Sequence, residues 1–196
     1  MVKKRFEDTR EHLLAIGEQI ILGKGFAAVG LAEILATADV PKGSFYHYFA
    51  SKEAYGVALL ERYFANYLED AKLRLNAPQG TAHDHLVEFF DAWQGKSCGN
   101  TVPCLVVKLA AEVADLSDTM RAALQSGCNH IVAALERTVA KGQDAGDINK
   151  QQPAEALALA IYEMWLGASL MTKLRRDRVP LETAMAVTKQ LIVPAA

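Results

Sequence analysis

The chain has 196 residues, a formal net charge of −2, 51% hydrophobic residues and 22% charged residues. Its acidic balance excludes a basic protein that coats nucleic acid with its whole surface, and no run of roughly 18 apolar residues predicts a membrane span. The length suits a small domain of about 50 residues and a larger one of about 140, and the high apolar fraction indicates an oligomer interface or a ligand cavity.

The N-terminal quarter predicts three helices. Residues 9–25 place apolar side chains at helical spacing, and residues 31–35 carry an apolar face typical of a second, short helix. Residues 38–40 then form a tight connection. Pro41 suits the first turn of a third helix, where its missing N–H costs nothing. The second and third helices with the connection between them therefore have the order helix, turn, helix.

The third helix has one apolar face and one polar face. Phe45 and Phe49 are four residues apart and share a face, so we expect both to point into a small core. The polar residues between them then point outward. Ser51 is typical of an N-cap, and Glu53 lies where the positive end of the next helix favours an acidic side chain.

The outward residues of the third helix suit DNA. Lysines neutralise phosphates, hydroxyls donate to phosphate oxygens or base edges, and a glycine lets the backbone come close to a ligand. Lys3, Lys4 and Arg5 add positive charge to the same quarter of the chain. The alternative is that the tyrosines cover a three-helix core and the lysines are merely solvated. The candidate DNA-binding residues are Lys42, Gly43, Ser44, Tyr46, His47, Tyr48 and Lys52.

The rest of the chain is an almost uninterrupted series of amphipathic helices separated by Gly, Pro and Asn turn signals, with no strand pattern. We expect helices over residues 51–76, 81–96, 103–114, 117–145, 152–176 and 180–193. The fold class is therefore all-α. The N-terminus is charged and helical, unlike a signal peptide, and three cysteines without framework spacing predict reduced thiols. We expect a cytoplasmic protein with no membrane association.

The segment from Val40 to Glu53 resembles the signature of the TetR family of one-component transcriptional repressors, with matches at Val40 and at residues 42–44, 46–49 and 51–53. The resemblance implies about nine helices: a helix-turn-helix DNA-binding domain over residues 1–53 and a helical regulatory and dimerisation domain over residues 54–196. It also implies a homodimer on a palindromic double-stranded operator, with half-sites roughly 34–36 Å apart or a multiple of that. Gly30 departs from the family pattern, because many members carry a Thr there.

In that family the last two long helices of each subunit pair into a four-helix bundle between subunits. Here these helices carry an apolar, alanine-rich set suited to close packing. The set expected in the bundle is Leu157, Ala160, Ile161, Met164, Trp165, Ala168 and Leu191.

Cys104 is the candidate sensor. It lies near the N-terminus of a predicted helix, where backbone N–H groups and the helix dipole stabilise a thiolate. The sequence is also similar to electrophile- and oxidant-sensing members of the family, in which the matching cysteine is the sensor. Cys98 is a possible second thiol, and Lys173 is a possible partner of the thiolate. A lone cysteine is otherwise most often a buried space-filling residue.

Three alternatives stay open from the residues alone. An apolar effector could bind without a covalent bond in a pocket lined by Phe90, Trp93, Tyr162 and Trp165, although each could equally be ordinary core. A thiol enzyme is a remote possibility, because no nucleophile elbow, phosphate loop or paired zinc motif is present. A purely structural helical module does not explain the cationic, hydroxyl-rich third helix. No cofactor and no metal are expected.

Overall fold

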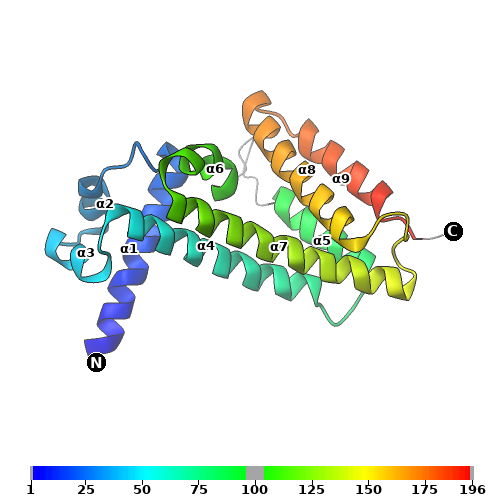
Figure 1. Cartoon of the computed structure of the whole chain (residues 1–196), viewed down its shortest axis with the longest axis horizontal. Helices are drawn as coiled ribbons and strands as arrows, with labels where there is room; N and C mark the ends of the chain where they lie inside the picture. Colours follow the sequence, from blue (N-terminus) through cyan, green and yellow to red (C-terminus); the bar gives the residue numbers. More distant parts are fainter. Residues whose placement is uncertain (1, 96–103, 195–196) are drawn as a thin grey trace. The chain divides into compact units, whose positions relative to one another are not determined.

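The computed structural model describes residues 2–95 and 104–194, with side chains from residue 8 onward, and these residues form nine α-helices and no strand (Figure 1). The all-α prediction is confirmed. The predicted roles of the Lys3 to Arg5 side chains and of Cys98 lie outside the described residues. The helices are α1 (Val2–Lys24), α2 (Leu31–Ala38), α3 (Lys42–Tyr48), α4 (Lys52–Leu75), α5 (Ala82–Gly95), α6 (Leu105–Leu116), α7 (Asp118–Ala145), α8 (Ala154–Arg175) and α9 (Val179–Leu191).

Helix boundaries agree with the sequence to within about two residues except at the first two helices. Helix α1 begins at Val2 rather than at residue 9, and α2 continues to Ala38. The first turns of α1 are rich in Lys, Arg and Glu, which favour helix without contributing an apolar face, so periodicity alone does not reveal them. Pro41 is the N-cap of α3, with φ −61° and ψ 144°, and not a residue of its first turn as predicted.

The chain divides into two compact units. One consists of residues 1–65 and 108–127, and the other of residues 66–107 and 128–196. Helices α4, α6 and α7 therefore contribute residues to both units. The sequence predicts a single boundary after residue 53, whereas each unit is assembled from two separate segments, because residues 108–127 of α6 and α7 pack with the N-terminal helices.

The core of the first unit is an aromatic cluster beneath α3. Phe45 and Phe49 are buried as predicted, and their ring centroids are 5.2 Å apart. The Tyr55 ring packs against both, and its hydroxyl donates a 2.7 Å hydrogen bond to the carbonyl of Leu13 in α1. This bond satisfies the only polar atom of a fully buried side chain, so the cluster fixes α3 against α1 and α4.

Gly56 lets α4 approach its neighbours in the same unit closely. A Cβ at this position would come within 2.6 Å of Met120 and 2.8 Å of the Phe26 ring. Both contacts are shorter than real Cβ atoms show, so any side chain at residue 56 would have to displace the end of the Met120 side chain and the Phe26 ring. Here the glycine serves packing rather than chain flexibility.

The core of the second unit is built around two tryptophans. Trp165 of α8 is fully buried, stacks on Phe90 of α5 with centroids 4.7 Å apart, and donates from Nε1 to Thr188 of α9 at 2.9 Å. Trp93 donates to Ser169 at 3.0 Å. Each indole N–H is thus satisfied inside the core, and these bonds join α5, α8 and α9.

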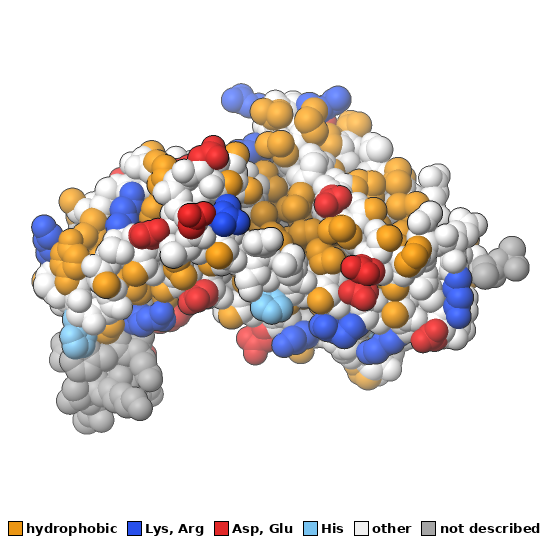
Figure 2. All heavy atoms as spheres, viewed as in Figure 1, with side chains coloured by type: hydrophobic (Ala, Val, Ile, Leu, Met, Phe, Trp, Pro, Cys, Tyr) orange, Lys and Arg blue, Asp and Glu red, His pale blue; other side chains and the backbone are white. Residues whose placement is uncertain are grey.

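Helix α8 also carries apolar residues on its outer face. Its length and composition would suffice to cross a membrane, in contrast to the expectation from sequence, although Ile161 and Trp165 are buried in the unit's own core. The exposed large hydrophobic residues of α8 are Leu159, Leu170, Met171 and Leu174. Figure 2 shows hydrophobic side chains gathered over α8 and α9. The fold of a single chain therefore does not require the apolar side chains on the outer face of α8.

Candidate nucleic-acid interface and sensor cysteine

Helix α3 presents most of the predicted DNA-binding residues to solvent. Lys42, Gly43, Tyr46 and His47 are exposed, and Tyr46 retains 53% of its accessible surface. Ser44 and Tyr48 are half-buried. The Tyr46 ring also packs edge-on against the buried Phe45 ring, with centroids 5.5 Å apart. The alternative in which Tyr46 covers the core therefore stays open beside the DNA-binding prediction.

Gly43 is not required by the chain's own packing. A Cβ built on it would meet no atom within 4 Å, and its φ is not positive. Nothing within the unit therefore excludes a side chain at this exposed site. The role of Gly43 in close approach to DNA stays a prediction.

Local signals hold α3 in place. Asp39 adopts the left-handed conformation, φ 53°, and ends α2, after which the Val40 N–H donates to the Leu35 carbonyl at 3.0 Å. After α3, the Ser51 hydroxyl accepts a hydrogen bond from the Ala54 N–H at 3.0 Å, which confirms the predicted N-cap of α4. The connection between α2 and α3 is thus short and defined at both ends.

Lys52 is engaged inside the unit rather than directed only outward. Its Nζ donates to the Phe26 carbonyl at 2.8 Å and lies 4.5 Å from the centroid of the Phe26 ring. Burial lowers the pKa of Lys52, and the nearby Glu112 carboxylate opposes that shift. The sequence offers no sign of this contact, which uses the ammonium that was predicted to bind phosphate.

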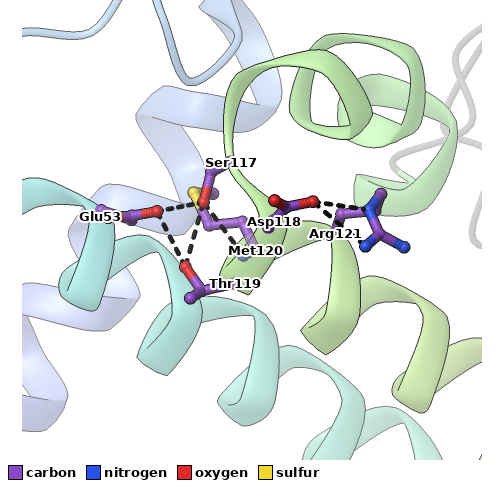
Figure 3. A network of polar contacts seen from close by, with 6 residues as sticks. All are labelled: Glu53, Ser117, Asp118, Thr119, Met120 and Arg121. Atoms are coloured by element: carbon purple, nitrogen blue, oxygen red, sulfur yellow. Dashed lines mark hydrogen bonds and ion pairs between the residues drawn. The ribbon is translucent and has the colours of Figure 1, made fainter.

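The neighbouring Glu53 is also committed to an internal contact. Its carboxylate accepts hydrogen bonds from the hydroxyls of Ser117 and of Thr119, the latter at 2.9 Å (Figure 3). These hydrogen bonds lower the pKa of Glu53, and the hydrogen bond from Ser117 contributes most. The Ser117 hydroxyl in turn accepts the Met120 N–H at 3.2 Å. The start of α4 is therefore tied to the start of α7.

Helix α6 contacts the end of α1 and the turn that follows it through two charged residues. The Glu112 carboxylate accepts the N–H groups of Phe26, at 3.1 Å, and of Ala27. Four residues earlier on the helix, the Lys108 ammonium donates to the Gly23 carbonyl at 3.1 Å. The sequence alone does not assign these partners to either residue.

Cys104 directly precedes α6 and is buried, with 8% of its surface exposed. The predicted position near a helix N-terminus is confirmed. Lys173 is exposed in the last turn of α8, and no hydrogen bond or ion pair joins it to Cys104 within the described residues. Its role as thiolate partner stays a prediction.

Two tyrosines of the same unit lie within electrostatic reach of Cys104. Burial raises the pKa of Tyr67 and of Tyr162, and the charge of a Cys104 thiolate contributes to both shifts. The Tyr162 hydroxyl also donates to Cys128 Sγ at 3.5 Å, and burial raises the pKa of the Cys128 thiol. Sequence reasoning missed Tyr67, because nothing local relates residue 67 to residue 104.

The four residues predicted to line an effector pocket pack against one another. Trp93 contacts Tyr162 and Trp165 with ring centroids 5.9 Å away in each case, and Phe90 stacks on Trp165. All four are buried. They form the aromatic core of the second unit, and a role in ligand binding stays a prediction.

An apolar groove with a volume of about 370 Å³ opens instead along α8 and α9. Its lining residues are Met164, Ala168, Met171, Arg175, Val179, Pro180, Thr183 and Ala184. Of the residues expected in an intersubunit bundle, Ala160, Met164, Ala168 and Leu191 are exposed or half-buried, whereas Leu157, Ile161 and Trp165 are buried within one chain.

Comparison with known families gives two matches. Residues 13–55 match the family described as bacterial regulatory proteins, tetR family, and residues 82–188 match the tetracyclin repressor-like C-terminal domain. The second match alone covers more than half of the chain. The chain belongs to the TetR family.

Relatives within the TetR family support this assignment over the full length. The HTH-type transcriptional repressor NemR of Escherichia coli (strain K12) is 42% identical over 198 residues, covering 100% of both chains. The repressor DhaR of Mycobacterium sp. (strain GP1) is 30% identical, covering 95% of this chain and 93% of its own. The crystal structure of E. coli NemR in its reduced form has a TM-score of 0.92 at 43% identity, covering 96% of this chain and 99% of that one.

TetR-family regulators bind operator DNA and act as dimers. Helices α2 and α3 lie within the matched residues 13–55, and the contact of the exposed face of α3 with DNA stays a prediction. The family consists of regulators rather than enzymes, which confirms the prediction that this chain is not an enzyme and sets aside the thiol-enzyme alternative.

Proposed function

We propose that this TetR-family repressor binds a palindromic operator as a homodimer in the cytoplasm and releases it when an electrophile or oxidant reacts with Cys104. Lys42, Gly43, Ser44, Tyr46, His47 and Tyr48 are the proposed DNA contacts. The observation that carries the proposal is full-length similarity to the repressor NemR combined with a buried cysteine directly before α6. NemR has been crystallised in a reduced form, which fits a thiol-based response.

Repression follows from occupancy of the operator. Two copies of α3, related by the two-fold axis of a dimer, read two half-sites, so only one separation of the reading helices allows tight binding. A change in either subunit that alters this separation weakens both sets of contacts together. An effector can thus act without touching DNA.

The direct test uses the purified full chain and labelled DNA from the region upstream of its own gene. We expect a specific retarded complex with a palindromic protected region, and its loss after treatment with N-ethylmaleimide. A chain that gives no specific retardation with upstream DNA contradicts the repressor proposal. A complex that resists N-ethylmaleimide but dissociates with an apolar ligand supports the non-covalent alternative instead.

Two lysines provide a test of which cations meet phosphate. Lys42 is exposed and free to contact DNA, so Lys42→Ala should lower operator affinity and reduce the slope of log K against log salt by about 1.8, about 0.9 for each copy in the dimer. Lys52→Ala should lower affinity with the slope unchanged, because its ammonium is engaged with Phe26. Fluorescence anisotropy over a salt series measures both quantities.

Lys72→Ala is the matched control, since Lys72 is an exposed lysine of α4 in the other unit. We expect parental affinity and slope for this variant. A reduced slope for Lys52→Ala would return Lys52 to the set of phosphate contacts that the sequence predicted.

A further inference from the structure

The turn between α1 and α2 is held by side chains rather than by its own backbone. Gly25 has a φ of +92°, and the chain then passes through residues 26–30 before α2 begins. The N–H groups of Phe26 and Ala27 have no partner in a helix, and the Glu112 carboxylate accepts both, one on each oxygen. Hydrogen bonds to a charged acceptor are the stronger kind, and backbone groups without a partner are costly.

The same peptide segment is held from a second side. Lys52 of α4 donates to the Phe26 carbonyl and covers the Phe26 ring, while Glu112 of α6 accepts the Phe26 N–H. Phe26 is thus bound at its donor and at its acceptor by side chains of opposite charge. A Cβ on Gly25 would come within 2.8 Å of the Glu112 carboxylate, so the glycine is required for this approach.

Lys108 adds a third contact from α6. It donates to the Gly23 carbonyl at the end of α1, where unpaired carbonyl groups and the helix dipole favour a cation. Lys108 and Glu112 are four residues apart on one face of α6. The helix therefore supplies a positive group to the C-terminus of α1 and a negative group to the N–H groups that follow it.

We propose that Glu112 is a positioning residue for the DNA-binding helices, and that α6 sets operator affinity through its hydrogen bonds to Phe26 and Ala27. The turn leads directly into α2, which packs on α1 and on α3. When the Glu112 carboxylate moves away, the N–H groups of Phe26 and Ala27 lose their acceptors together. The turn then no longer fixes the position at which α2 begins. Because α6 begins one residue after Cys104, this contact also gives the effector a route to α3, and that part rests on the function proposed above.

The decisive variant is Glu112→Gln. An amide side chain has one acceptor oxygen and one NH₂ donor. Placed as Glu112 is, with one N–H group facing each terminal atom, it accepts from one of the two N–H groups and turns a donor toward the other. We expect about tenfold weaker operator binding, as loss of a charge-assisted hydrogen bond predicts. We also expect faster hydrogen exchange at the Phe26 and Ala27 amides, measured by NMR on the full chain.

Asp115→Asn is the matched control, because Asp115 is an exposed carboxylate of the same helix with no ion pair or hydrogen bond among the described residues. It should leave both measurements unchanged. Lys108→Met serves as a second variant that removes only the contact to Gly23, and it should weaken operator binding by about threefold. Parental operator affinity in both Glu112→Gln and Lys108→Met overturns the proposal, as does unchanged exchange at residues 26 and 27 in Glu112→Gln.

The effector route is tested on the parent protein treated with N-ethylmaleimide. We expect exchange at Phe26 and Ala27 to become faster after alkylation. Release of DNA without this change shows that the effector acts by another route, while the thiol-switch proposal stands. If alkylation releases no DNA, the thiol switch fails, and the positioning role of Glu112 is judged by the affinities of its variants.

Discussion

Cys104→Ser should abolish the release of operator DNA by N-ethylmaleimide, leaving at least about a hundredfold difference from the parent in the reagent concentration needed for release. In the parent, we expect the Cys104 thiolate to add to the maleimide double bond, so that a carbon–sulfur bond forms and the adjacent carbon takes up a proton. Cys104 is 8% exposed, so we expect the bulky adduct to displace neighbouring side chains at the start of α6. Serine keeps the size of the side chain and lacks the nucleophile.

Cys128→Ser is the control for this result. Cys128 is half-buried, accepts a hydrogen bond from Tyr162, and has a thiol pKa raised by burial, so its thiolate fraction near neutral pH is small. Its variant should release DNA as the parent does. Mass spectrometry of the alkylated parent should place the first adduct on Cys104. If Cys104→Ser still responds like the parent, the reactive thiol is elsewhere, and Cys98→Ser becomes the variant to measure.

Met171→Glu should dissociate the dimer, because a carboxylate buried in an apolar interface costs several kcal/mol. It should also lower operator affinity by at least about a hundredfold, because a monomer binds the operator through one copy of α3 instead of two. Met171 is 45% exposed on α8 and lines the apolar groove between α8 and α9. Gly167 faces open space on the same helix, and the exposed Ala160 is also small, so a partner helix can approach closely. Analytical ultracentrifugation and operator titration measure the two effects.

Leu73→Glu is the matched control, because Leu73 is 73% exposed on α4 and lies away from α8 and α9 in sequence. The same charge introduced there should leave the dimer and operator affinity intact. A Met171→Glu protein that sediments as the parent dimer would place the subunit interface on another surface.

Local patterns are sufficient to identify the reading helix from the sequence. The spacing of Phe45 and Phe49 indicates a buried face, and both side chains are in the core. Ser51 is a typical N-cap residue, and it caps α4. These signals lie within a few residues of one another, where helical periodicity and capping preferences operate.

Patterns of the same kind are less informative for α8. Apolar residues surround much of that helix, so periodicity does not separate its two faces. The inward residues are Leu157, Ile161 and Trp165, while Ala160, Met164 and Ala168 remain at or near the surface of the chain. Which face meets α5 and α9 depends on the packing of Phe90 against Trp165 and of Trp165 against Thr188, and both contacts cross between helices.

Residues close together in the chain are enough to establish the all-α class, the helix-turn-helix with its lysine and aromatic residues, and the position of Cys104 next to a helix start. The partners of the charged residues, in contrast, depend on tertiary packing. Glu112 meets Phe26 across 86 positions, and Glu53 meets Ser117 across 64. Contacts at such separations arise from how the helices pack, and no spacing rule within one helix specifies them.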